Sequence, residues 1–170
     1  MKLNRDHLQY WPFYCEENIW HLCQEPHLLP FERKVVFISN ENRCVAMKNQ
    51  RTGSLVYWDY HVVLLFRDTD WKIADLDTLL SLPCRSKKYL SKTFVPTEPP
   101  IFRVVEAGHY IRCFTSDRRH MIDRNEKYLQ PPPPWDTIGG SGFNLLDFVD
   151  TANSTHGQLY ELNEMYTEFT

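Results

Sequence analysis

Residues 55–77 read LVYWDYHVVLLFRDTDWKIADLD, a long apolar run that a short polar break separates from a second apolar run. β-Branched and aromatic side chains favour strands, so we expect one strand within 55–66 and another over 71–77. The polar residues 67–70 between them have the length of a hairpin loop. This stretch therefore predicts an antiparallel pair of strands.

A hairpin centred on Asp68 places His61 opposite Asp75, because the residue numbers of cross-strand partners sum to a constant. A carboxylate beside an imidazole fixes the tautomer of the ring and stabilises its protonated form, which makes His61 a candidate general base. Asp77 is the diagonal alternative to Asp75. The competing interpretation is that His61 is a core histidine whose ring is bound by a backbone carbonyl.

A candidate nucleophile lies upstream of this hairpin. Residues 15–23 carry apolar side chains at the spacing of a short amphipathic helix, and Pro12 precedes them. Cys15 is then at or next to the start of a helix, where partial positive charge and free amides lower the pKa of a thiol. Glu16 and Glu17 partly oppose this effect, so a neighbouring imidazolium would have to supply most of the activation. The same amides, that of Cys15 included, are candidates for one side of an oxyanion hole.

The bulk composition is that of a globular protein. The chain has 170 residues, of which 42% are hydrophobic and 24% charged, so we expect a single domain over 1–170. A net charge of −3, with acidic and basic residues interleaved, predicts neither nucleic acid nor a membrane as partner. The first residues contain no apolar secretory segment, so we expect an intracellular protein with reduced thiols. Four thiols lack the setting of Cys15 and read as packing residues: Cys23, Cys44, Cys84 and Cys113.

The rest of the chain adds smaller expectations. Residues 34–39 and 102–106 read as further strands, whereas 108–119 and 143–149 read as helical or irregular. The run Pro131 to Pro134 must be extended, either as a rigid connection within the domain or as a docking site for an SH3- or WW-type partner. No C-x-x-C and no helical H-x-x-x-H spacing occurs, so the sequence predicts no metal site.

Several ordered blocks resemble one known family. Residues 58–62 read WDYHV, the motif for which the eukaryotic protein N-terminal glutamine amidohydrolases are named. The other blocks follow in the order of that family: YCEENIW at 14–20, VFISN at 36–40, DLDTLL at 75–80, FRV at 102–104, SDRRHM at 116–121, the proline run, and NLLDF at 144–148. Within SDRRHM we expect Asp117 and Arg118 to form a structural ion pair. The resemblance covers nearly the whole chain, which departs from the family in being shorter before the cysteine block.

The resemblance implies an α/β (α+β) fold of the papain or transglutaminase type. A central, mostly antiparallel sheet would be flanked by helices in a three-layer α-β-α sandwich. Carried over by position, Cys15 is the nucleophile, His61 the base and Asp75 the orienting carboxylate, which are also the residues that rank highest without the resemblance. The implied protein is a monomer without cofactor, in the cytoplasm and also in the nucleus.

The implied reaction converts the N-terminal glutamine of a protein or peptide to glutamate through a thioester and releases ammonia, as a step of the N-degron (N-end rule) pathway. Restriction to a terminal residue requires recognition of the α-amino group, which a buried carboxylate would provide. Glu17 and Asp59 are the candidates for this role, and Asn18 and Tyr60 are candidates for further hydrogen bonds to the substrate. The alternative is that Glu17 and Asp59 are charges at a helix start and a strand edge.

Two other classes of function fit the same residues. A papain-like peptidase or a transglutaminase-like acyl transferase could use the same triad, and would cleave a peptide bond or incorporate an amine instead of releasing ammonia. A non-catalytic interaction protein that acts through the proline run would be indifferent to replacement of Cys15 by alanine.

Overall fold

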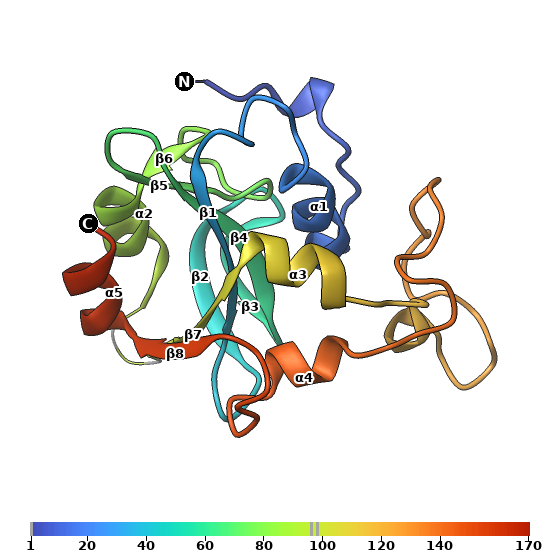
Figure 1. The fold of residues 1–170 in the computed structure, drawn as a ribbon. Coiled ribbons are helices and arrows are strands. Elements are labelled where there is room, and N and C mark those ends of the chain that lie inside the picture. Colours follow the sequence, from blue (N-terminus) through green and yellow to red (C-terminus); the bar gives the residue numbers. More distant parts are fainter. Residues whose placement is uncertain (1, 96, 98) are drawn as a thin grey trace.

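The computed structural model describes residues 2–95, 97 and 99–170, and an antiparallel sheet runs through its centre (Figure 1). Six strands form this sheet in the order β6-β5-β4-β1-β7-β8, and all five neighbouring pairs are antiparallel. Their bounds are β1 Glu32–Ser39, β4 His61–Arg67, β5 Trp71–Ala74, β6 Cys84–Arg85, β7 Ile101–Glu106 and β8 Gln158–Glu161. A separate two-stranded ribbon consists of β2 Val45–Gln50 and β3 Gly53–Trp58.

Helices cover both faces of the sheet. The α-helices are α1 Cys15–Leu22, α2 Ser86–Thr93, α3 Ala107–Cys113, α4 Leu145–Val149 and α5 Leu162–Glu168, and short 3-10 turns are η1 Arg5–His7 and η2 Arg119–Met121. No helix among the described residues has the length and apolar character that a membrane crossing needs. In Figure 1, α2 and α5 lie on one side of the sheet, and α1, α3 and α4 lie on the other.

The alternation of side chains along β1 and β4 explains these layers. Val35 and Phe37 of β1 join Leu64 of β4 in an apolar cluster with α1, α3 and α4. Val36 and Leu65 point the other way, into a cluster with α2 and α5. Since successive residues of a strand face opposite sides, a continuous apolar run gives a sheet that is buried on both faces. The expected α+β architecture, a mostly antiparallel sheet between helices, is confirmed.

The 55–66 run, which we expected to be one strand, is divided between two. β3 ends at Trp58 and β4 begins at His61, so Asp59 and Tyr60 form a bend between the ribbon and the main sheet. Asp59 is the one residue that marks this bend in the sequence, and the aromatic residues on either side of it, Trp58 and Tyr60, are as typical of strands as the rest of the run. The second expected strand, 71–77, ends early at Ala74.

The register of the hairpin also differs from the expected one. Leu64 pairs with Ala74, whereas a hairpin centred on Asp68 would pair Leu64 with Lys72. The shift is two residues, so each side chain stays on its expected face. Asp75 follows the end of β5 and is therefore not a cross-strand partner of His61 in the ladder.

A long irregular segment, 114–144, leaves the sheet after α3 and returns at α4 (Figure 1). It is fixed to the N-terminal part of the chain by hydrogen bonds: Trp11 Nε1 donates to the Pro131 carbonyl at 2.8 Å, and the Tyr14 hydroxyl donates to the Gln130 carbonyl at 3.1 Å. The proline run thus lies against the segment that precedes α1, which favours its interpretation as a rigid internal connection.

Candidate active site

A cavity of about 390 Å³ opens where the start of α1, the start of β4 and the 114–144 segment meet. The cavity is mostly apolar and contains a few polar groups, which is the usual composition of a small-molecule site. Its lining residues are Phe13, Cys15, Arg43, Trp58, Asp59, Tyr60, His61, Asp77, His120, Met121, Leu129, Leu145 and Leu146.

Cys15 is the first residue of α1, as expected, and its partly buried thiol lines the cavity. From the helix start we expected the pKa of this thiol to be lowered. In the structure the pKa of Cys15 is instead raised well above the usual range. Burial is the main cause, and the negative charges of Glu16 and Asp77 add to it, while the backbone amide of Val62 acts in the opposite direction. The free thiol is therefore protonated near neutral pH, and a reaction through its thiolate would need a base to take the proton.

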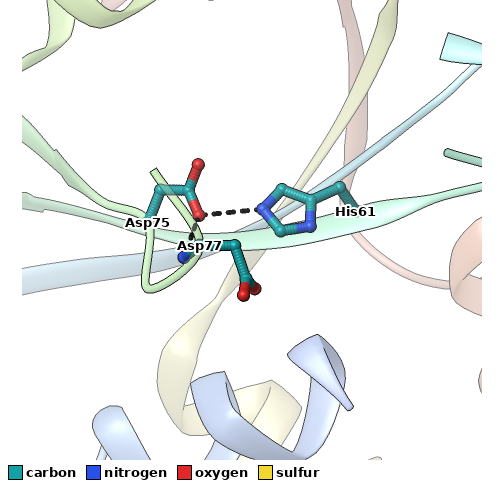
Figure 2. Close-up of side chains that lie close together, drawn as sticks. All are labelled: His61, Asp75 and Asp77. Atoms are coloured by element: carbon teal, nitrogen blue, oxygen red, sulfur yellow. Dashed lines mark hydrogen bonds and ion pairs between the residues drawn. The ribbon is translucent and has the colours of Figure 1, made fainter. Parts of the chain in front are cut away.

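His61 and Asp75 form a buried pair (Figure 2). His61 Nε2 lies 2.9 Å from Asp75 Oδ1, and the same oxygen accepts the backbone N–H of Asp77 at 2.9 Å. The other oxygen accepts the Tyr89 hydroxyl at 2.8 Å and Gln50 Nε2 at 3.4 Å. Since an ionised carboxylate only accepts, His61 donates through Nε2 and its Nδ1 lone pair is left to accept a proton.

His61 and Asp75 shift each other's pKa in opposite directions. Burial alone would lower the pKa of His61, but the charge of Asp75 and its hydrogen bond outweigh burial, so this pKa is raised. Burial alone would raise the pKa of Asp75, but the charge of His61 and the donated hydrogen bonds lower it. The pair thus favours the imidazolium–carboxylate state, which is the state that follows uptake of a thiol proton by His61.

Among the described residues, one group of side chains has the arrangement of a metal site: single ligand atoms of His61, Asp75 and Asp77 lie within 4.8 Å of one another. The two carboxylates already accept hydrogen bonds. Asp75 accepts four hydrogen bonds, and Asp77 Oδ1 accepts the Tyr10 hydroxyl at 2.6 Å. A metal ion would have to displace these donors, so the donor set fits a hydrogen-bonded pair better than a metal site.

Two further residues beside the thiol, Glu16 and His120, were missed as site residues. Glu16 is fully buried, and its Oε2 accepts the Tyr60 hydroxyl at 3.0 Å and the Cys15 thiol at 3.7 Å. His120 Nε2 lies 3.3 Å from Glu16 Oε1 and 3.4 Å from the Tyr60 oxygen. Glu16 reads as a helix-start charge in the sequence, and nothing in the sequence indicates that the distant His120 lies beside it.

The structure does not bring all four expected substrate-binding residues to the cavity. Asp59 and Tyr60 line it, with Asp59 at an exposed rim 3.5 Å from Arg43. Glu17 and Asn18 do not line it, because their buried side chains are engaged elsewhere. Asn18 accepts from the Trp11 amide and donates to the Trp11 carbonyl, both at 2.8 Å, so it fixes the segment before α1.

Glu17 forms a buried ion pair with Arg118. Arg118 Nε and Nη2 donate to its two carboxylate oxygens at 2.7 and 2.8 Å, and Trp135 Nε1 donates at 2.7 Å. The expected pair of Asp117 with Arg118 is therefore wrong, since Asp117 pairs with Arg119 on the surface. A bidentate, buried pair of this kind ties α1 to the 114–144 segment.

Replacement of Arg118 by leucine is expected to lower the free energy of unfolding by about 3–5 kcal/mol, because it leaves Glu17 buried without its cation. Urea unfolding measures the change. Arg119→Leu is the matched control, since the Arg119 pair with Asp117 is exposed and its loss should leave the unfolding midpoint near that of the wild type. Equal stability of the two variants would contradict a structural role for the Glu17–Arg118 pair.

Comparisons with known proteins show which family the chain resembles. A family model described as N-terminal glutamine amidase matches residues 10–169. The chain is 38% identical over 183 residues to the protein N-terminal glutamine amidohydrolase of Homo sapiens, covering 97% of this chain and 89% of that protein. It is 38% identical over 184 residues to that of Bos taurus, with 98% and 89% covered. It is 35% identical over 175 residues to that of Drosophila melanogaster, with 92% and 85% covered.

Proposed function

This chain belongs to the N-terminal glutamine amidase family, and from that premise we propose that it deamidates the side chain of an N-terminal glutamine in proteins or peptides. The products are an N-terminal glutamate and ammonia. The observation that carries the proposal is the cavity shared by Cys15 and His61, with His61 held by Asp75 at 2.9 Å.

The proposed reaction begins with transfer of the Cys15 proton to His61 Nδ1 as the sulfur attacks the amide carbon of the glutamine side chain. The tetrahedral oxyanion takes a hydrogen bond from the Cys15 backbone N–H, which lies in the first helical turn and has no intrahelical acceptor. When the intermediate collapses, the carbon–nitrogen bond breaks and His61 returns the proton to the departing ammonia.

A thioester between Cys15 and the substrate remains after the first half of the reaction. His61 Nδ1 takes a proton from water, the hydroxide oxygen bonds to the thioester carbon, and the carbon–sulfur bond breaks. The sulfur recovers its proton from His61, so the enzyme returns to its starting state. Asp75 keeps its charge throughout and stabilises the imidazolium that forms twice in each turnover.

The test uses three peptides that differ at their first residue: free N-terminal glutamine, free N-terminal asparagine, and N-acetylated glutamine. Ammonia is expected from the free glutamine peptide alone. Mass spectrometry should show that the peptide keeps its full length. Comparable release from the other two peptides would overturn the specificity. Peptide fragments would indicate a papain-like peptidase, and incorporation of an added labelled amine would indicate an acyl transferase.

We place the reaction in the N-degron (N-end rule) pathway, in the cytoplasm and nucleus, with a monomeric enzyme. The support for this placement is chemical, since the reaction turns an uncharged N-terminal side chain into a carboxylate that a later enzyme of the pathway can recognise. The test uses a reporter protein with N-terminal glutamine. We expect the reporter to be stable in cells that lack this protein, and to be degraded again when the protein is restored.

A further inference from the structure

The chemistry of the substrate limits where its α-amino group can be recognised. In glutamine, four single bonds separate the α-nitrogen from the amide carbon that Cys15 attacks, a reach of about 5 Å when extended. An acceptor for the ammonium must therefore lie close to the sulfur. Three carboxylates act on the pKa of the Cys15 thiol through their charge, and are near enough to be considered: Glu16, Asp77 and Asp59.

Two of these carboxylates are poorly suited to bind an ammonium. Asp59 has 59% of its side chain exposed and lies 3.5 Å from Arg43, so water and a cation already compensate its charge. Asp77 accepts the Tyr10 hydroxyl at 2.6 Å and also faces the positive charge that His61 acquires during the reaction. Asp59 thus already has a cation beside it, and the partner of Asp77 is the imidazole of His61.

Glu16 differs from both, because it is fully buried and one of its oxygens makes no hydrogen bond with any described residue. That oxygen, Oε1, lies 3.3 Å from His120 Nε2 without hydrogen-bond geometry. The other, Oε2, lies 3.7 Å from the sulfur and accepts the Tyr60 hydroxyl. A buried carboxylate with an unused oxygen gains strongly from a cation that donates to it.

We propose that Glu16, flanked by Tyr60, is the binding site for the α-ammonium group of the substrate, an inference that rests on the proposed function. Glu16 does not itself line the cavity, but Tyr60 and His120 do, and in the free protein the ring of His120 takes the position next to Oε1. The ammonium displaces this ring and donates to Oε1. An acetylated or missing amine brings no charge to Glu16, so the site rejects internal glutamines.

The same contact links binding to chemistry. The negative charge of Glu16 opposes ionisation of Cys15, and an ammonium beside Glu16 cancels that charge. Recognition of the N-terminus is therefore expected to raise the rate of attack as well as the affinity. This role differs from that of Glu17, the neighbouring carboxylate, whose charge is already neutralised by Arg118.

The experiment compares two peptides with the same side-chain amide: one with N-terminal glutamine, and its des-amino analogue, in which hydrogen replaces the α-amine. For each, kcat/KM is measured with the wild type, Glu16→Gln and Asp59→Asn. Glu16→Gln is expected to lower kcat/KM at least about 100-fold for the amine peptide, and no more than about threefold for the analogue. A merely structural role would lower both values equally.

The outcomes separate the two proposals. If the wild type releases no ammonia from the amine peptide, the proposed function fails. If the wild type releases ammonia and Glu16→Gln keeps the wild-type preference for the amine peptide, only the Glu16 site is overturned. Loss of the preference in Asp59→Asn instead would assign the site to Asp59. Circular dichroism checks the fold of each variant. If Glu16→Gln does not fold, Glu16→Asp replaces it, because aspartate keeps the charge but withdraws it from the amine. Glu16→Asp must then lower the preference for the amine peptide about tenfold, or the proposal is wrong.

Discussion

Replacement of Cys15 by alanine is expected to lower ammonia release from an N-terminal glutamine peptide by at least about 10⁴-fold. The change removes the only thiol among the described residues that line the cavity, and without it no thioester can form. A coupled ammonia assay measures the loss. Since the thiol is partly buried and Glu16 is its only acceptor in the part of the chain that the structure describes, the thermal unfolding midpoint should change little.

Cys113→Ala is the matched control for this prediction, because Cys113 is also a partly buried free thiol but does not line the cavity. It should retain wild-type activity. Ammonia release by Cys15→Ala at a comparable rate would eliminate the covalent mechanism, and would leave a reaction in which His61 activates water directly.

Asp75→Asn is expected to lower kcat by about 10³–10⁴-fold, because the amide can no longer hold the charged imidazole of His61. The acidic limb of the pH–rate profile should move as well. Wild-type activity rises as His61 loses its proton, at a pH above the usual value of about 6.5 because Asp75 raises the pKa. Without that charge, burial dominates and the limb moves to lower pH. Residual activity with an unshifted limb would show that Asp75 does not act on His61.

The same variant gives a stability prediction with a defined pH window. The pKa of Asp75 is lowered on folding, so its contribution to stability is present above the unfolded value of about 4 and is lost as the pH falls. The pKa of His61 is raised, so its contribution is present below about 6.5 and is lost as the pH rises through the folded value. The stability difference between wild type and Asp75→Asn is therefore expected to be largest between about pH 4 and 6.5, as measured by urea unfolding.

The parts of the site that depend on local signals could be predicted from the sequence. Cys15 at a helix start follows from the spacing of apolar residues after Pro12, and the α+β class follows from the apolar runs and the family resemblance. The His61–Asp75 contact was expected for a partly incorrect reason. The real hairpin is shifted by two residues, and Asp75 reaches His61 because β5 has already ended.

The assignment of carboxylates could not be made from the sequence. Glu16 and Glu17 are adjacent on one helix, about 100° apart around its axis, and either could lie beside the Cys15 thiol. The choice depends on Arg118 and Trp135, which lie more than a hundred residues away in an irregular segment. Local patterns carry no information on such contacts.

The pairing of Glu17 with Arg118 and Trp135 has a consequence for folding during synthesis on the ribosome. The helix that carries Cys15 is synthesised early, but the groups that bind its buried acid, Arg118 and Trp135, are synthesised more than a hundred residues later. A nascent chain that stops short of this point cannot bury Glu17 without a large penalty. The surroundings of Cys15 described above can therefore form only when most of the polypeptide has been synthesised.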